Sequence, residues 1–491
     1  MAKDDQGLLR PDLWELLLPA IKAARQAGRD FAAGNAYVPR QPLVAYRQND
    51  AGWPQVTKDT LGMGTKSDLI DWSELFDVNE NRFTRILVGK VPPLADAVRE
   101  ISRRAMGDPD LLRGVSILAP RMADHDEAEV RGQAEFEIAR RLVGVILNRA
   151  DALGAETDDE LRAIYQQLER ARFAKELSGD IVVPLVAVAF VSHDPVHIDG
   201  NVWIERLTEA DHRVRALNWL QQDELSPWVA AGATHAVVVR GVTFPNTLRD
   251  LNEQIPFTLF EDEVRNTTEA VHIVTEKATG YAQVLVRPDG WAANWMQDLP
   301  PLWAAWRGRA YPDVLSGRQW ANEMTPIDAA QIADIARIAK SLKAAPKNVQ
   351  MAARRLRRTT FRDSAEDQVL DVAIGIEALV GKEVDALTHR MAQRAAIALA
   401  RRIPAAATYN LLKQFYSIRS AIAHGSEPKS WTVKVGDDKL NGVQIGLFLL
   451  RELLQNRLLG DDPWDAGSLD ERMLESFGRP ADDDEGNEQE A

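Results

Sequence analysis

The first third of the chain has the hydrophobic pattern of α-helices. In residues 127–154, apolar side chains recur every three or four positions, which predicts an amphipathic helix. The next segment has Thr157 and Glu160 at the spacing of a capping box, so a second helix is expected from there to Gly179. We therefore predict that residues 1–179 form a mainly helical N-terminal region.

The pattern changes at Asp180, where a run of β-branched and apolar residues begins. DIVVPLVAVAFV is typical of a buried strand, because it has no polar face. Further strands are predicted at NVWIERLT, THAVVVRGVTF, VHIVTE and AQVLVRP (residues 201–208, 234–244, 271–276 and 282–288). Residues 180–310 are therefore expected to be a β-rich region with a sensing or recognition role.

Helical spacing returns after residue 310 and continues to about residue 465. Five or six amphipathic segments end at glycines or before prolines, which predicts an all-helical bundle over residues 311–465. The last residues, 466–491, are predicted to be an acidic disordered tail, because ADDDEGNEQEA has six acids and no base. The fold class that follows is α+β: a mixed N-terminal region with a β-rich part, then a helical domain.

Composition narrows the classes of protein that this chain can be. Its 491 residues include no cysteine, which excludes disulfides, thiolate metal sites and a cysteine nucleophile and fits a cytoplasmic protein. No apolar run has the length of a membrane span, and the N-terminus lacks a signal-peptide core. The net charge of −14 argues against a protein that coats nucleic acid with its whole surface.

One segment departs from the acidic average. Residues 346–362 hold six basic residues and no acid. Four of the arginines are close enough along a helix to follow an RNA backbone: Arg354, Arg355, Arg357 and Arg358. The alternative is that this run is only a solvated helix face.

The segment FYSIRSAIAHG carries the strongest candidate chemistry. Arg419 and His424 are five residues apart, and Gly425 ends the helix directly after them. Arginine matches a phosphate group with a planar, permanently charged fork, and histidine can transfer protons near neutral pH. On a regular helix the two side chains would point about 140° apart. They would therefore act together where the helix ends, or across a symmetric dimer. The alternative is a histidine favoured by the helix dipole beside an arginine that extends over the core.

FYSIRSAIAHG resembles the signature of the HEPN superfamily, specifically its ApeA-like branch. EDQVLDVAIGIEALVG, residues 366–381, resembles the acidic-start helix of the same branch. The basic helix before it and the arginine-rich helix after it follow in the same order. The resemblance covers residues 325–460, about a third of the chain.

The resemblance implies a helical domain that dimerises and, in many members, a metal-independent endoribonuclease of anti-phage or toxin systems. Arg419 and His424 match the R-x4-6-H motif, and cleavage would leave a 2′,3′-cyclic phosphate. The expected partners are RNA, a second copy of the chain, and a phage-derived trigger or an antitoxin. Active members often have Asn, Asp or His after the arginine, whereas this chain has Ser420. The alternative is therefore a HEPN scaffold that binds RNA, a nucleotide or a protein without cleaving.

Glu377 is a supporting candidate on the second of these helices. It lies among apolar residues and is expected to be partly buried. It would orient Arg419 or His424, or else it would pair with another arginine such as Arg394.

Metal and cofactor motifs add little. His193 and His197, with Asp194 and Asp199, have donor types that bind metals, but the Asp-Pro and Asp-Gly pairs predict a turn between strands. No Walker A loop, dinucleotide fingerprint, G-x-S-x-G or H-E-x-x-H motif is present. We therefore expect neither a metal nor a cofactor.

Overall fold

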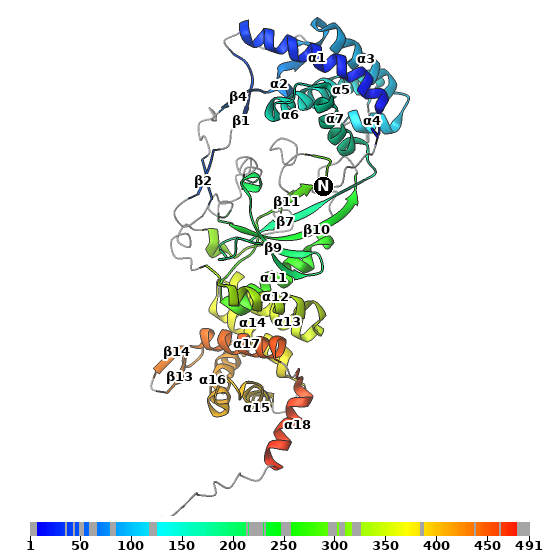
Figure 1. Cartoon of the computed structure of the whole chain (residues 1–491). Coiled ribbons are helices and arrows are strands. Elements are labelled where there is room, and N and C mark those ends of the chain that lie inside the picture. The colour runs from blue at the N-terminus through cyan, green and yellow to red at the C-terminus, as the bar shows by residue number, and fades with distance from the viewer. Residues whose placement is uncertain are drawn as a thin grey trace, which may run out of the picture. The chain divides into compact units, whose positions relative to one another are not determined.

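The computed structural model (Figure 1) describes most of the chain. The described residues are 7–34, 37–42, 45–48, 54–57, 66–78, 85–116, 125–212, 215, 229, 232–246, 257–292, 302–303, 310–316, 326–382, 387–436, 438–460 and 463–478. They form two compact units, each of which draws on several stretches of the chain. The first unit is Met1–Pro184, Leu207–Leu259 and Ala282–Gly308, and the second is Leu185–Arg206, Phe260–Tyr281 and Arg309–Ala491.

Helices and an antiparallel sheet both occur, so the predicted α+β class is confirmed. The sequential regions 1–179, 180–310 and 311–465 stay a prediction, because the compact units are interleaved along the chain. Within the described ranges, no helix has both the length and the hydropathy needed to cross a bilayer.

The first unit has a helical part whose core forms as the periodicity predicts. Its helices are α1 (Pro11–Gly34), α2 (Trp72–Leu75), α3 (Pro92–Ala105), α4 (Pro109–Val115), α5 (Glu127–Glu137), a π-helical segment (Ile138–Gly144), α6 (Val145–Leu153) and α7 (Asp158–Phe173). Leu13, Leu17 and Ile21 repeat at four-residue spacing on α1 and are fully buried. The capping box of Thr157 and Glu160 is confirmed, with both of its hydrogen bonds present.

The end of α7 corrects one prediction. The helix stops at Phe173 and not at Gly179, because Ala174 is extended and the side-chain amide of Asn246 donates to its carbonyl at 2.9 Å. Gly179 lies in a strand instead. A Cβ atom there would be 2.5 Å from the carbonyl oxygen of Arg287 on the neighbouring strand, so this glycine permits close strand packing.

The sheet of the first unit is antiparallel and centred on β7. Its strands lie in the order β12 (Leu302–Trp303), β11 (Gln283–Pro288), β7 (Glu176–Pro184) and β10 (His235–Pro245). Val182 of β7 is opposite Val238 on one side and Leu285 on the other. Three of the predicted strands are thereby confirmed. Short two-stranded pairs complete the unit: β1 (Arg40–Pro42) with β4 (Lys66–Ile70), β2 (Ala45–Gln48) with β3 (Pro54–Thr57), and β5 (Phe76–Asp77) with β6 (Ile86–Leu87).

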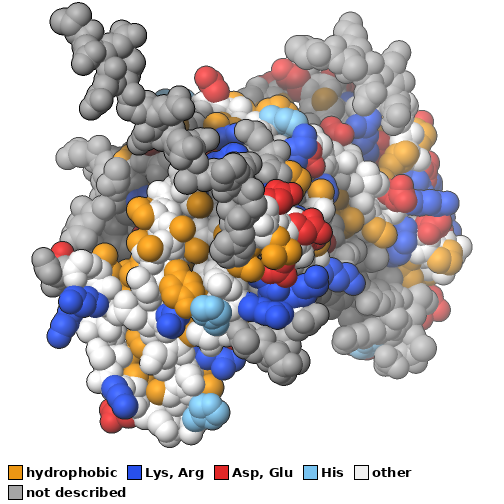
Figure 2. Space-filling view, turned by 90° about the horizontal axis from the view of Figure 1, so that it is seen from below, with side chains coloured by type: hydrophobic (Ala, Val, Ile, Leu, Met, Phe, Trp, Pro, Cys, Tyr) orange, Lys and Arg blue, Asp and Glu red, His pale blue; other side chains and the backbone are white. Residues whose placement is uncertain are grey.

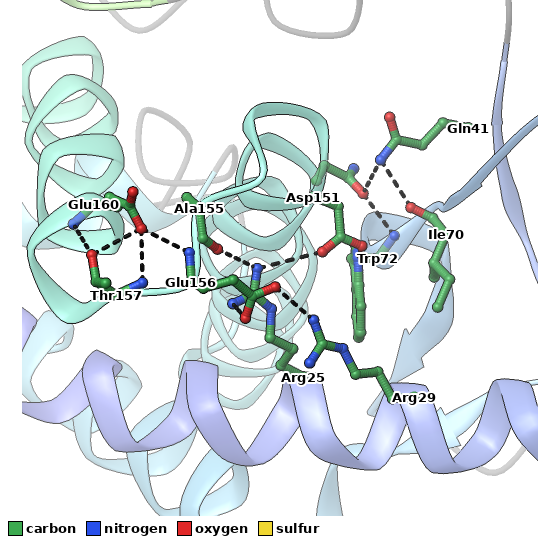
Figure 3. Close-up of polar contacts among 11 residues, drawn as sticks. Arg25, Arg29, Gln41, Ile70, Trp72, Asp151, Ala155, Glu156, Thr157 and Glu160 are labelled. Atoms are coloured by element: carbon green, nitrogen blue, oxygen red, sulfur yellow. Dashed lines mark hydrogen bonds and ion pairs between the residues drawn. The ribbon is translucent and has the colours of Figure 1, made fainter.

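A buried polar network ties α1 to the turn after α6 (Figure 3). The guanidinium of Arg25 donates to the carbonyl of Ala155 at 2.7 Å and pairs with Asp151 and Glu156 at 3.5 and 3.3 Å. The indole of Trp72 donates to Asp151 at 2.6 Å. The charge of Arg25 is therefore compensated within the fold.

The second unit is mainly helical (Figure 1). Its elements are β8 (Val196–Asp199), β9 (Val202–Arg206), α11 (Glu261–Thr275), α12 (Ala329–Ala344), α13 (Lys347–Arg358), a 3-10 turn (Thr359–Phe361), α14 (Ala365–Val380), α15 (Leu387–Leu399), α16 (Ala405–Ala423), β13 (Thr432–Val435), β14 (Asp438–Asn441), α17 (Gly442–Leu459) and α18 (Ala466–Gly478). Helix α17 lies against α12, α13, α14 and α16. Its Leu449, Leu450 and Leu453 are fully buried, so this helix is the centre of the bundle. The predicted strand at 201–208 is confirmed as β9, which forms a hairpin with β8.

Two further predictions are wrong in this unit. VHIVTE is the last part of helix α11 and not a strand. Nearly every residue from Asn266 to Ile273 is buried, so this part of the helix shows no alternation of buried and exposed positions, and its β-branched residues favour a strand by propensity. The predicted disordered tail begins too early, because residues 466–478 form α18, where Leu469 is buried and Asp470 pairs with Arg394. The acidic residues 479–491 lie outside the described residues.

Candidate functional site

Helix α16 is held in the bundle by the apolar stripe that its sequence predicts. Leu411, Phe415 and Ile418 are buried. The ring of Phe415 rests on Gly446 of α17, where a Cβ atom would be only 2.4 Å from the ring. Ile422, one turn later, is only half-buried. The C-terminal turn of α16 therefore emerges from the core, and the candidate residues lie on this turn.

His424 is the last residue of that turn and is exposed to solvent. The amide of Gly425 donates to the carbonyl of Ile422 at 3.0 Å, and that of Ser426 donates to Ala421 at 2.9 Å. This pair of hydrogen bonds is a Schellman motif, and Gly425 has the positive φ of 71° that it requires. The motif fixes the backbone of His424 and leaves its imidazole in solvent.

Arg419 is positioned by an ion pair with α14. Its guanidinium lies 3.1 Å from a carboxylate oxygen of Glu377, and both side chains are partly exposed, at 32% and 25%. The partly buried position expected for Glu377 is confirmed. Pairing of Glu377 with Arg394 is wrong, because Arg394 holds Asp470 with two contacts of 2.7 Å.

The α16 edge, which we define as Arg419, Ser420 and His424, combines a positioned arginine with a free histidine. Within the described chain, Arg419 and His424 share no hydrogen bond, as their spacing on the helix predicts. Ser420 is exposed next to Arg419. Burial and the charge of Glu377 raise the pKa of the neighbouring Tyr416, so its phenol stays protonated. Of the three residues of this edge, His424 is the one whose side-chain type commonly transfers protons near neutral pH.

The four predicted RNA-binding arginines do not share one environment. Arg354 and Arg358 are exposed, one turn apart on α13. Arg355 pairs with the buried Asp371 of α14 at 2.6 Å. Arg357 is half-buried. Only two of the four are open to a long polyanion.

Figure 2 shows Lys and Arg side chains in separate groups, with apolar and acidic side chains between them. On this face, the described Lys and Arg side chains would offer RNA local positive groups.

The structure also brings together charged residues that the sequence analysis did not select. A cavity of about 340 Å³ opens in the second unit. It is lined by Glu261, Arg265, Glu269, Tyr281, Ala310, Arg354, Arg357, Arg358 and Phe361, which we call the arginine cavity. Glu261, Arg265 and Glu269 are four residues apart on α11, so they share one face of that helix. This spacing is a signal in the sequence, but the prediction of a strand at residues 271–276 obscured the helix.

Burial dominates the electrostatics of the arginine cavity. Glu269 is 2% exposed, and burial raises its pKa to about 7 against the pull of Arg357, Arg265 and Arg354. Burial also lowers the pKa of the Arg357 guanidinium, which lies over the ring of Phe361 at 5.3 Å. Among the described residues, its guanidinium donates one hydrogen bond, to the carbonyl of Ala310 at 3.5 Å.

The histidines near β8 are used in local contacts. The ring of His197 contacts the carbonyl of Gly200 at 3.0 Å, and His193 contacts Arg206. The Asp-Gly pair forms the predicted turn of the β8–β9 hairpin. In the part of the chain that the structure describes, no three His, Cys, Asp or Glu residues are grouped as metal ligands would be.

In comparisons with known proteins, no protein-family model, curated protein or solved structure matches this chain. We therefore infer its function from the residues and their geometry.

Proposed function

We propose that the chain is a metal-independent endoribonuclease of the HEPN type, with Arg419 and His424 at its active site. The observation that carries the proposal is the α16 edge. A histidine is held in solvent by a Schellman motif, five residues after an arginine that is positioned by Glu377. A purely structural histidine at a helix end would not need an arginine anchored on the adjoining turn.

The chemistry needs a base and an acid. The base removes the proton from a 2′-hydroxyl, whose oxygen then attacks the adjacent phosphorus. The acid protonates the departing 5′-oxygen, so the products are a 2′,3′-cyclic phosphate and a 5′-hydroxyl. A histidine near neutral pH can perform either role, and Arg419 stabilises the charge that develops on the phosphorane oxygens.

One His424 performs one of these roles at a time, so two are required. A dimer with a twofold axis beside the α16 edge brings together His424 and Arg419 from both protomers. The exposure of this edge in one chain is compatible with such pairing. The exposed Arg354 and Arg358 supply additional phosphate contacts. The proposed role is cytoplasmic anti-phage defence by abortive infection or toxicity, released by a phage-derived trigger or held back by an antitoxin.

A second function is favoured by one specific observation. The carboxylate of Glu377 already neutralises part of the charge of Arg419, and Ser420 adds no ionisable group. Both features suit a HEPN scaffold that binds RNA or a protein without cleaving it. The two functions differ in whether His424 transfers a proton during RNA cleavage.

The test is cleavage of single-stranded RNA and tRNA by the full chain in EDTA, beside His424→Ala and Arg419→Ala. We expect the wild type to give 2′,3′-cyclic phosphate ends and both variants to lose at least about a hundred-fold in rate. His389→Ala is the matched control, because His389 is also exposed in this unit and contacts only Tyr409 among the described residues.

Mixing tests the composite site. If each site uses His424 from both protomers, an exchanged equimolar mixture with His424→Ala should show roughly half the activity per wild-type chain. Full activity per wild-type chain would rule out the shared site. Binding of RNA with no cleavage by any variant, including in phage-infected lysate, would establish the scaffold instead.

A further inference from the structure

We infer that the arginine cavity is a binding site for a small molecule that carries a terminal phosphate group. This inference goes beyond the nuclease proposal and uses none of its catalytic residues, because no residue of the α16 edge lines the cavity. Arg354 and Arg358, which the nuclease proposal uses for additional RNA contacts, are shared by the two proposals. Four arginines from two helices converge on it against two glutamates. Arginine is the side chain best suited to phosphate, since its planar fork donates two parallel hydrogen bonds to a pair of phosphate oxygens.

The arrangement follows from helix geometry. On α13, Arg354, Arg357 and Arg358 have three- and four-residue spacing and therefore lie on one face. On α11, Arg265 lies one turn from Glu261 and one turn from Glu269. Helices α11 and α13 pack against each other, so the two charged faces line one cavity.

The positive charge of the cavity is largely uncompensated by the fold. Arg354 and Arg358 have no ion-pair partner among the described residues, and Arg357 donates only to the carbonyl of Ala310. Arg265 pairs with Asp262 at 2.6 Å. By contrast, Arg355 on the same helix is neutralised by Asp371, and it does not line the cavity. Of the four cavity arginines, Arg265 alone has a carboxylate partner among the described residues.

Glu269 does not cancel this charge. Because burial raises its pKa to about 7, a large fraction of the carboxyl is neutral near neutral pH. A protonated carboxyl can donate a hydrogen bond to a phosphate oxygen, whereas an ionised one would repel it. The acid in the cavity is therefore compatible with an anionic ligand.

The size and the lining point to a phosphate ester of a small organic group. A volume of about 340 Å³ is at the lower end of the range for small-molecule sites, about 300–1,000 Å³, and exceeds the need of free phosphate alone. Tyr281 and Phe361 supply apolar surface beside the arginines. A long RNA backbone needs an extended groove, and a cavity of this volume suits a small ligand better.

The test is to titrate the full chain with phenyl phosphate, inorganic phosphate and phenol and to measure binding by isothermal titration calorimetry. We expect saturable binding of phenyl phosphate and none of phenol. If inorganic phosphate binds more weakly, the ligand is an ester; if it binds equally well, the ligand is free phosphate. Arg354→Ala and Arg358→Ala should each lower the affinity by about ten-fold.

A variant outside the cavity and a charge-conserving variant inside it serve as controls. Arg337→Ala removes an exposed arginine on α12 outside the cavity and should leave the affinity unchanged. Arg357→Lys keeps the charge but not the fork and should also weaken binding. Circular dichroism checks that each variant is folded. Equal affinity of the wild type, Arg354→Ala and Arg358→Ala would overturn the inference. So would displacement of phenyl phosphate by RNA that lacks terminal phosphates, tested on His424→Ala.

Discussion

Arg25 and Arg357 show two ways in which this chain treats an arginine away from water. Arg25, in the first unit, is 7% exposed and meets Asp151, Glu156 and the carbonyl of Ala155 (Figure 3). Arg357, in the second unit, meets one carbonyl and the face of Phe361. The first guanidinium has two carboxylate partners, whereas the second has no ion-pair partner among the described residues.

The difference separates a structural arginine from a binding arginine. Removing a charge from water is costly unless a partner of opposite charge is present. Arg25 has such partners, so it links α1 to the turn after α6. Arg357 makes no ion pair among the described residues, and a ligand with negative charge would supply one. Incomplete compensation is therefore the better indicator of a binding site than burial alone.

The largest effect on stability is expected at Arg25, whose charge has the most partners. Arg25→Ala leaves Asp151 without its arginine and should lower the free energy of unfolding by about 3 kcal/mol. Thermal and urea unfolding of the full chain measure this loss.

Arg29→Ala is the matched control, since Arg29 pairs with the same Glu156 but is 51% exposed. It should cost less than about 1 kcal/mol. Similar losses of stability in the two variants would mean that burial does not distinguish the two arginines. Arg25 would then not be a structural arginine of the kind described above.

Much of the fold could be predicted because local patterns agree with tertiary packing. The capping box at Thr157 and the strands at 234–244 and 282–288 are set by neighbouring residues in the sequence. Helix α11 could not, because its second half is buried on nearly every side and contains β-branched residues, so that half has no helical periodicity in its polar and apolar positions. The early end of α7 depends on Asn246, which is distant in sequence.

The functional residues also differ in whether the sequence alone could predict them. Arg419, His424 and Glu377 could be selected from one motif and its helical context, and the structure brings Arg419 and Glu377 together. The arginine cavity could not be predicted, because it needs α11 beside α13. Only tertiary contact separates Arg355, which pairs with Asp371, from Arg357, which does not.

A second prediction concerns Glu269, whose carboxyl is protonated more readily in the folded chain than in the unfolded one. Its pKa rises from 4.5 to about 7 on folding. The stability of this protonated form is fully present below the unfolded pKa and is lost as the pH rises through the folded pKa. The free energy of unfolding should fall by about 3 kcal/mol between about pH 5 and pH 8 through this group.

Glu269→Gln removes the ionisation and should remove this part of the pH dependence. Urea unfolding of both proteins at the two pH values, in phosphate-free buffer, isolates the difference because other titrating groups are shared. Parallel pH profiles would mean that Arg265, Arg354 and Arg357 compensate the carboxylate fully. The charges of the cavity would then be balanced within the fold, as those of the Arg25 network are, and the contrast between Arg25 and Arg357 would not hold.

The smallest effect on stability is expected at Glu377. Its ion pair with Arg419 is partly exposed, and so it lies between the paired Arg25 and the unpaired Arg357. Glu377→Gln keeps the shape of the side chain and removes its charge beside Arg419. Because both side chains are partly exposed, the free energy of unfolding should change by less than about 1 kcal/mol. If the carboxylate orients Arg419 for phosphate, as the proposed nuclease requires, RNA cleavage should still fall several-fold at unchanged stability.

A charge-matched control decides between orientation and long-range electrostatics. Glu366→Gln removes an exposed carboxylate from the first turn of the same helix, α14, and should leave cleavage unchanged. If Glu377→Gln instead tightens RNA binding and leaves cleavage unchanged, the carboxylate only neutralises Arg419. Arg419 would then belong with Arg25, as an arginine whose charge the fold has already compensated, and the nuclease proposal would lose its phosphate-binding residue.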